Sequence, residues 1–313
     1  MKAVVYDKAN SPDILVLREV AKPIPGDDEV LIKIHAAAAN AADYRSMKMG
    51  IIPKRRIFGS DIAGQVEAVG KNIRQFTVGD EVLGDISDCG LGGFAETVAV
   101  PEAPLVLKPA VISFETAAAI PMSAVTALQG LRNPGYMQPG QKVLICGAGG
   151  GVGTFAVQLA KHFGAEVTAV CSEKNAKVMQ SIGADQVIDY QKNGLTQTGQ
   201  LYDLILAVNG NYPLTTYRRL LASGGVCVVI GGALVQVMKT LLFGKLLSIG
   251  SKSIYLLRAK SDAKDLAFII NLVAAGQVKP VIDRVYPLAE TAEAMRYLSA
   301  GHALGKVVIK IGS

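Results

Sequence analysis

The chain has 313 residues, of which 50% are hydrophobic and 19% are charged, and its formal net charge is +6. This length is typical of two domains, and the composition is that of an ordinary globular protein. Lysines and arginines are scattered and not interleaved with aromatic residues, which argues against binding to nucleic acid. The positive charge favours an anionic small molecule as the partner.

The N-terminus, the apolar segments and the cysteines set further limits. The sequence MKAVVYDKAN runs directly into a strand pattern without the apolar core of a signal peptide. Three lysines interrupt the most apolar region, 231–257, and Arg258 follows it, so we expect no integral membrane segment. Four widely separated cysteines indicate reduced thiols, and we predict a cytoplasmic protein.

The first part of the chain predicts a small antiparallel barrel or sandwich. Short β-like runs punctuated by Pro and Gly occur at 2–6, 29–34, 64–69, 81–83 and 94–100, with no convincing long helix among them. Ser113 then has the character of an N-cap, and the alanine-rich run 114–120 predicts a short helix before Pro121.

A glycine-rich turn follows. Residues 143–153, VLICGAGGGVG, are an apolar β-branched run that ends on glycines, and residues 154–165 continue with helical apolar spacing. Glycine permits positive φ angles and close approach of a ligand to the backbone, while the next helix offers unpaired N–H groups and the positive end of its dipole. The turn therefore predicts a pyrophosphate cradle made by Ala148, Gly149, Gly150, Gly151, Val152 and Gly153.

The segments after this turn give it a structural context. Apolar runs at 166–170, 186–190, 202–208 and 224–231 alternate with helix-like segments, between the first three runs and before the last. This alternation is typical of parallel strands buried on both faces and joined by right-handed crossovers. We predict an α/β fold with a doubly wound, Rossmann-type parallel sheet that binds a dinucleotide.

The end of the second strand bears on which dinucleotide is bound. An acidic residue that bonds the adenosine ribose is expected about 20 positions after the glycines. Cys171 occupies that position and is followed by Ser172, Glu173 and Lys174, so a hydroxyl and a cation are available for a 2′-phosphate. This favours NADPH (NADP⁺) over NADH. Two alternatives stay open: Lys174 is a solvated lysine, or Glu173 turns inward and accepts the ribose hydroxyls.

The C-terminal third contains three further patterns. Residues 262–275 and 292–298 predict amphipathic helices, and the final strand, GKVVIKI, suggests that the C-terminus returns to the first domain. The apolar stretch 231–257 is expected to be a cleft-lining helix or a dimer contact. Because it carries Lys239 and Lys245, association with a membrane interface is a weaker hypothesis.

The order of several motifs resembles the medium-chain dehydrogenase/reductases, in the branch of zinc-free quinone and enone oxidoreductases. These motifs are MKAVVYD at the start, GSDIAGQVEAVG (59–70), VGDEVLG (78–84), GGFAETVAV (92–100), the glycine turn, GADQVIDY (183–190) and GKVVIKI. The resemblance implies a GroES-like β-barrel catalytic domain of residues 1–121 and 262–313, a Rossmann domain of residues 122–261, and a homodimer.

The zinc-binding branch of this family takes its ligands from Cys and His, and the matching positions here are Asn40, Ser60 and Met122. None of these residue types is a strong zinc ligand, so we expect no metal. Without a Lewis acid, reduction of a conjugated double bond or a quinone is less demanding than oxidation of a simple alcohol.

Resemblance also suggests site residues. Asn40 would present its amide to the substrate oxygen or nicotinamide, Asp43 would orient the loop, and Tyr44 or Arg45 would donate a hydrogen bond or proton. An Asx-type turn is the alternative for Asn40 and Asp43. Further cofactor contacts are expected from residues at strand ends and near the nicotinamide: Thr126, Tyr190, Asn209, Gly231 and, on the pyrophosphate, Lys306. Thr126 bonding to its own helix turn, and Lys306 as a surface lysine, are the alternatives.

The leading hypothesis is thus an NADPH-dependent oxidoreductase that transfers hydride to small-molecule quinones or α,β-unsaturated carbonyls without zinc. A zinc-independent carbonyl or alcohol oxidoreductase, a non-catalytic NADPH-binding sensor, and one part of a larger acyl-reducing assembly remain as alternatives.

Overall fold

The fold comes from a computed structural model that describes residues 1–6, 14–192, 194–196, 199–209, 212–232, 234–248 and 250–312. The chain forms two compact units. Unit 1 comprises Met1–Val125, Ser261–Gly276 and Pro280–Ser313, and unit 2 comprises Thr126–Lys260 and Gln277–Lys279.

Unit 1 is built on strands from both ends of the chain. Its larger sheet has the order β14-β15-β3-β4-β5-β7, β6 also pairs with β3, and β1 and β2 form a separate antiparallel pair. The strands are β1 (Lys2–Tyr6), β2 (Leu15–Glu19), β3 (Glu29–Ala39), β4 (Asp61–Val69), β5 (Glu81–Asp85), β6 (Thr97–Pro101), β7 (Leu105–Leu107), β14 (Ile282–Pro287) and β15 (Lys306–Lys310). This antiparallel β architecture confirms the fold class predicted for the first part of the chain.

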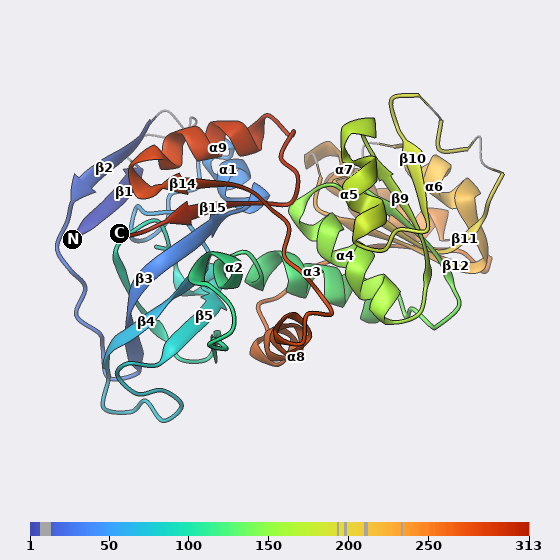
Figure 1. Ribbon diagram of the computed structural model, residues 1–313. Coiled ribbons are helices and arrows are strands. Elements are labelled where there is room, and N and C mark those ends of the chain that lie inside the picture. Colours follow the sequence, from blue (N-terminus) through green and yellow to red (C-terminus); the bar gives the residue numbers. More distant parts are fainter. Residues whose placement is uncertain are drawn as a thin grey trace. The chain divides into compact units, whose positions relative to one another are not determined.

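The last strand joins the first domain, as its sequence suggests. β15 pairs antiparallel with β3, with Val307 opposite Ala39, and β14 runs parallel to β15. Figure 1 shows these two C-terminal strands beside β3. Alternating apolar residues of the strands fill one core, in which Tyr6, Phe58 and Phe94 are fully buried.

Helices of unit 1 follow the predicted patterns with one exception. They are α1 (Ala41–Lys48), α2 (Phe114–Ala118), the start of α3 (Pro121–Arg132), α8 (Ala263–Ala274) and α9 (Thr291–Ser299), with short 3₁₀ turns η2 (Ser87–Cys89) and η4 (Leu288–Glu290). Ser113 caps α2 by accepting a hydrogen bond from the Thr116 N–H at 3.1 Å. The segment after Asn40 was expected to be a loop and is the helix α1. The Asp43 carboxylate accepts the Asn40 N–H at 2.8 Å, which satisfies a donor at the helix start.

Unit 2 contains a six-stranded sheet with every strand parallel, in the order β10-β9-β8-β11-β12-β13. Its elements are the rest of α3, β8 (Lys142–Cys146), α4 (Gly151–His162), β9 (Glu166–Cys171), η3 (Glu173–Asn175), α5 (Ala176–Ser181), β10 (Gln186–Asp189), β11 (Tyr202–Val208), α6 (Leu214–Leu220), β12 (Leu221–Ile230), α7 (Leu234–Leu247) and β13 (Ser253–Leu256). This strand order is that of the doubly wound dinucleotide-binding fold, so the predicted Rossmann-type sheet is confirmed.

One local prediction in unit 2 is wrong, and another is incomplete. Among the described residues between β10 and β11, Gln191, Lys192, Leu195 and Thr196 form turns where a helix was expected. Gly199, in the left-handed region with φ 63°, favours such a turn over a helix. The apolar stretch 231–257, expected to be a cleft-lining helix or a dimer contact, contains the helix α7 and also supplies the sixth strand, β13.

Candidate functional site

The glycine turn between β8 and α4 is built by backbone crowding. Gly147 has φ 74°, and a Cβ on it would lie 2.1 Å from the Val208 carbonyl oxygen. A Cβ on Gly153, within the first turn of α4, would lie 2.3 Å from the Gly147 carbonyl oxygen. By contrast, a Cβ on Gly150, the N-cap of α4, would meet only that oxygen, at 3.6 Å. The turn is therefore fixed by Gly147 and Gly153, and the backbone at Gly150 is open to a ligand.

Parallel strands bring the other predicted cofactor residues to the same edge of this sheet. Cys171 ends β9, Tyr190 follows β10, Asn209 follows β11 and Gly231 follows β12. Asn209 has φ 52°, which is rare outside glycine and occurs where a strand end is held in a special conformation. The carboxyl edge of a doubly wound sheet is where such folds bind ligands. Thr126 is buried on α3.

The end of β9 carries the residues that were predicted to contact the adenosine ribose. Cys171 is buried, and desolvation, followed by repulsion from Asp189, raises the pKa of its thiol to about 11, so the thiol itself is uncharged at neutral pH. Asp189 lies opposite Cys171 in the β9–β10 pairing. Ser172 follows as the N-cap of the turn η3, and the exposed Lys174 lies within that turn. The Glu173 carboxylate pairs with Lys192 at 2.8 Å. In this structure Glu173 is therefore directed to a lysine, and both alternatives, a solvated Lys174 and a Glu173 that accepts the ribose hydroxyls, stay predictions.

A buried polar cluster forms in unit 1. The Lys306 ammonium, on β15, donates to Asn40 Oδ1 at 2.5 Å, to Asp61 Oδ2 at 3.0 Å and to Ser123 Oγ at 3.1 Å. These four residues come from four separate segments of the chain, and each is almost fully buried. An ammonium has three N–H groups, and all three are used here. The prediction that Lys306 reaches a pyrophosphate gains no support, and Lys306 is a buried residue, not a surface lysine.

Asn40 is also occupied within this cluster. Its Nδ2 donates to Asp61 Oδ2 at 2.9 Å and to Ser60 Oγ at 3.2 Å, while its Oδ1 accepts from Lys306. Both N–H groups of the amide are thus used within the protein, and its role toward a substrate stays a prediction. The alternative of bonds to local backbone groups holds in part, since Asn40 Nδ2 lies 3.5 Å from the Ala38 carbonyl oxygen and the Asp43 carboxylate accepts the Asn40 N–H. Sequence reasoning missed Asp61 and Ser123. The available signal for Asp61 was a carboxylate opening an otherwise apolar strand, DIAG.

Two further carboxyl groups lie beside this cluster. Burial raises the pKa of Asp43 to about 7. The hydrogen bond from the Asn40 N–H lowers this pKa, and repulsion from Asp61 raises it further. Asp43 also accepts the Gly59 N–H at 3.3 Å, so it ties α1 to the segment before β4. Asp85 lies opposite Asp61 in the β4–β5 pairing, and burial followed by repulsion from Asp61 raises its pKa to about 7.

The aromatic residue predicted as a donor lies on α1 beside two cations. The Arg45 guanidinium and the Lys48 ammonium lie 5.7 and 5.5 Å from the centre of the Tyr44 ring. Tyr44 is half-buried, so its ring is partly accessible. Its role as a hydrogen-bond or proton donor stays a prediction.

Zinc, which the resemblance raises, does not fit the residues present. Asn40 and Ser60 occupy expected ligand positions, and neither is a ligand that zinc prefers. The cation already in contact with Asn40 is the Lys306 ammonium. Among the residues the structure describes, no group of three or more His, Cys, Asp or Glu could hold a metal ion.

Comparisons with known proteins agree with this architecture. Residues 26–110 match the alcohol dehydrogenase GroES-like domain, and residues 182–309 match a family described as zinc-binding dehydrogenase. The solved quinone oxidoreductase from Coxiella burnetii superposes with a TM-score of 0.91 at 26% identity, covering 100% of this chain and 99% of that one.

Two curated relatives cover nearly the whole chain. The chloroplast envelope quinone oxidoreductase homolog of Arabidopsis thaliana is 34% identical, over 93% of this chain and 92% of that protein. The chloroplastic NADPH-dependent alkenal/one oxidoreductase of the same plant is 32% identical, over 99% of this chain and 79% of that protein. This chain belongs to the medium-chain dehydrogenase/reductase superfamily, in its quinone oxidoreductase-like branch, and is an NAD(P)H-dependent oxidoreductase.

Proposed function

We propose that this protein uses NADPH to reduce quinones or α,β-unsaturated carbonyl compounds without a metal ion. The observation that carries the proposal is the end of β9. A neutral buried thiol, Cys171, is followed there by Ser172, Glu173 and Lys174. Of the nearby acids, Glu173 pairs with Lys192, and Asp189 lies opposite Cys171 in the β9–β10 pairing. A 2′-phosphate fits these groups better than a free 2′-hydroxyl, which needs an acceptor. The name of the alkenal/one relative, which includes NADPH, supports the same choice.

Unit 2 supplies the groups that would hold the coenzyme. The open backbone at Gly150 and the N-terminus of α4 face the pyrophosphate position, and Ser172 and Lys174 suit the 2′-phosphate. When bound, NADPH supplies a hydride from its nicotinamide ring. The proposal assigns Thr126, Tyr190, Asn209 and Gly231 to the remaining contacts.

Unit 1 supplies the polar groups for the acceptor. Zinc chemistry would polarise a simple carbonyl, and the cluster of Asn40, Ser60, Asp61, Ser123 and Lys306 lacks the ligands for it. Conjugate addition of hydride places negative charge on an oxygen that hydrogen-bond donors stabilise. We assign Tyr44, whose ring is partly accessible, as the hydrogen-bond donor to this oxygen. We assign Asn40, Asp43 and Lys306 as residues that position α1.

Steady-state oxidation of NADPH and NADH by chelator-washed protein tests the proposal. The panel contains an aryl quinone, a short enone, a long-chain enal and a simple aldehyde. We expect turnover with the quinone or the enones, little with the aldehyde, and a preference for NADPH. Faster turnover of the aldehyde would establish the carbonyl oxidoreductase instead. Coenzyme binding by calorimetry without turnover of any compound would establish the NADPH-binding sensor.

Two finer predictions accompany the function. The homodimer remains a proposal, for which light scattering of the purified protein is the test. The cytoplasmic location also remains a proposal, since the two plant relatives are named as chloroplast proteins.

A further inference from the structure

Helix α7 in unit 2 buries its polar side and exposes its apolar side. The residues that it buries are Gln236, Thr240 and Gly244. Its exposed residues include seven large apolar ones, namely Leu234, Val235, Met238, Leu241, Leu242, Phe243 and Leu246. Leu242 and Leu246 are 66% and 67% exposed. A helix of a globular protein ordinarily turns its apolar side to the core, so this exposed surface needs a partner.

Specific contacts fix the orientation of α7. Gln236 Nε2 donates to the Tyr212 carbonyl at 3.2 Å, and Thr240 Oγ1 donates to the Gln236 carbonyl at 2.8 Å. A Cβ on Gly244 would lie 3.3 Å from the Ile254 carbonyl oxygen, so the helix lies close against β13 at this point. Rotating the apolar side inward would break these contacts and push larger side chains against β13.

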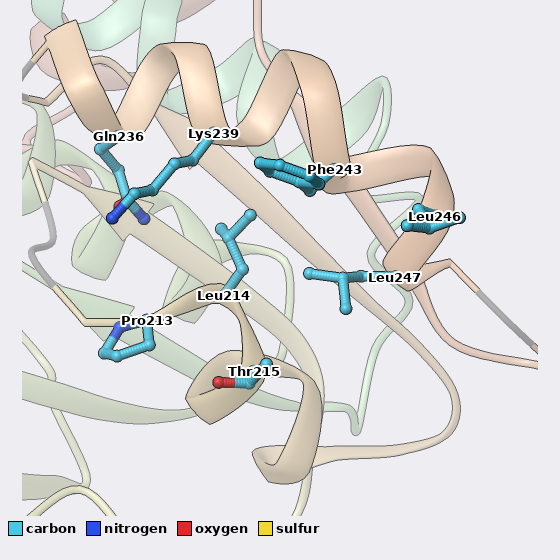
Figure 2. A pocket seen from close by; sticks show the side chains of 8 residues that line it. All are labelled: Pro213, Leu214, Thr215, Gln236, Lys239, Phe243, Leu246 and Leu247. Atoms are coloured by element: carbon cyan, nitrogen blue, oxygen red, sulfur yellow. The ribbon is translucent and has the colours of Figure 1, made fainter.

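The exposed surface of α7 continues into a groove. Its volume is about 340 Å³, and its lining comes from α7 and from the start of α6, as Figure 2 shows. Leu214 of α6 points toward Phe243 of α7, while Lys239 lies at the other end of the groove. Apolar side chains with one nearby cation suit an amphipathic, negatively charged partner.

The segment of the chain that contains α6, α7 and β13 carries charge of one sign only. Residues 204–261 contain no Asp or Glu. They contain seven basic residues, namely Arg218, Arg219, Lys239, Lys245, Lys252, Arg258 and Lys260. On a helix with 3.6 residues per turn, Val235, Met238, Leu242 and Leu246 form one stripe, and Lys239 and Lys245 flank it on either side. Long lysine stems can extend along apolar surface while the ammonium stays in a polar layer.

This charge distribution bears on whether the exposed side of α7 contacts a second copy of the chain or a membrane surface. In a twofold dimer through α7, the same surface of each copy would meet, so both sides of the interface would carry Lys239 and Lys245. The segment offers no carboxylate to compensate them. A bilayer surface with anionic lipids provides negative charge for Lys239 and Lys245 and an apolar layer for the leucines between them.

We propose that the exposed side of α7 binds the surface of membranes that contain anionic lipids. In the part of the chain that the structure describes, no helix has the length and apolar character needed to cross a membrane. The 14 residues of α7 rise about 21 Å, which is shorter than a hydrocarbon core of about 30 Å. The helix therefore lies along the interface, with its leucines inserted and its lysines among the headgroups. This proposal does not depend on the substrate or coenzyme of the protein.

Co-sedimentation of the full chain with vesicles at physiological salt tests this inference. Vesicles of phosphatidylcholine alone are compared with vesicles that also contain phosphatidylglycerol. We expect the protein to sediment with the mixed vesicles and to stay in solution with phosphatidylcholine alone, with binding that weakens as salt is raised. A protein that stays in solution with both kinds of vesicle overturns the proposal.

Variants separate the two parts of the surface. Lys239→Gln/Lys245→Gln should weaken binding about 30-fold, from about 1 kcal/mol per lysine near an anionic surface. Leu242→Ser/Leu246→Ser should weaken it at least about 10-fold and, because both side chains are exposed, leave the melting temperature unchanged. Lys264→Gln/Lys279→Gln removes two exposed lysines elsewhere and should bind as the wild type does.

Light scattering distinguishes self-association through the same surface. Leucine variants that turn a dimer into a monomer while sedimenting with vesicles as before would show that α7 binds a second copy, and would overturn the proposal. Equal binding by the α7 variants and the control variant would also overturn it.

Discussion

The glycine turn of unit 2 and the polar cluster of unit 1 are two different ways to build a functional region. The turn is made almost entirely of backbone, over residues 147–153, and its shape depends on the absence of side chains at Gly147 and Gly153. The cluster is made of side chains that converge from the N-cap of α1, β4, α3 and β15, with Lys306 at its centre. A site made of backbone tolerates an added side chain wherever no atom lies close. The stability of a buried charged cluster, by contrast, depends on each of its side chains.

The largest effect is expected from removing the cation of the cluster. Lys306→Met leaves the Asp61 carboxylate, which is 0% exposed, without its ammonium, and should lower the free energy of unfolding by about 3–5 kcal/mol. Lys310→Met on the same strand is the control, since its ion pair with Glu115 is long, at 3.7 Å, and partly exposed. That change should cost less than about 1 kcal/mol. Urea unfolding measures both.

A double variant sharpens this result. Asp61→Asn added to Lys306→Met removes the uncompensated charge and should recover part of the lost stability. Equal stability of Lys306→Met and Lys310→Met would mean that the buried ion pair does not hold the cluster together.

The turn should respond in a position-specific way. Gly153→Ala places a Cβ 2.3 Å from the Gly147 carbonyl, so we expect about 1–3 kcal/mol of lost stability and loss of coenzyme binding. Gly150→Ala meets nothing closer than 3.6 Å, so it should fold and yet bind NADPH more weakly, because its methyl lies where a phosphate would approach. Thermal unfolding and calorimetry separate these outcomes. Wild-type affinity in Gly150→Ala would place the pyrophosphate elsewhere.

This contrast also explains how far the sequence could predict the molecule. The glycine turn was predictable because glycine at fixed spacing directly reports backbone geometry, and continuous β-branched runs such as VLIC and LILAV report buried parallel strands. The segment between β10 and β11 was predicted as a helix because its glycines were given too little weight. β13, only four residues long, was concealed by the apolar helix before it.

The polar cluster could not be predicted in the same way. Asn40, Asp61, Ser123 and Lys306 are far apart in the chain, and no spacing records that the fold brings them together. Resemblance identified Asn40 and Lys306 as residues of interest and assigned them to substrate and pyrophosphate. The contacts between them follow from the antiparallel pairing of β15 with β3, which places the start of β15 beside the end of β3. Side-chain partners of this kind depend on tertiary structure.

The pH dependence of stability tests the carboxyl groups around the cluster. Asp85 has a pKa raised to about 7, whereas the unfolded carboxyl titrates near its ordinary value of about 4. Between these values the folded protein keeps a proton that the unfolded chain releases. The free energy of unfolding should therefore fall as pH rises from about 4 to 7, by up to about 1.4 kcal/mol per pH unit for one such group.

Asp85→Asn provides the matched variant. Asparagine can still accept the Ser87 N–H through its carbonyl oxygen, a bond of 2.9 Å in the wild type, and it does not titrate. Urea unfolding between pH 5 and 8 should show a shallower slope in this variant, with Asp43 responsible for part of what remains. An unchanged slope would exclude Asp85 as a source of the pH dependence.

The smallest expected effect concerns the coenzyme at the exposed end of β9. If Lys174 pairs with the 2′-phosphate, Lys174→Ala should weaken NADPH binding by about 1–2 kcal/mol and leave NADH binding unchanged, because only NADPH carries that phosphate. Lys177→Ala, an exposed lysine on the adjoining helix α5, is the control and should affect neither coenzyme. Calorimetry with both coenzymes measures the difference. Equal weakening of NADPH and NADH by Lys174→Ala would instead indicate a general electrostatic effect, and the selectivity would then have to come from Ser172 or from the backbone of the turn η3.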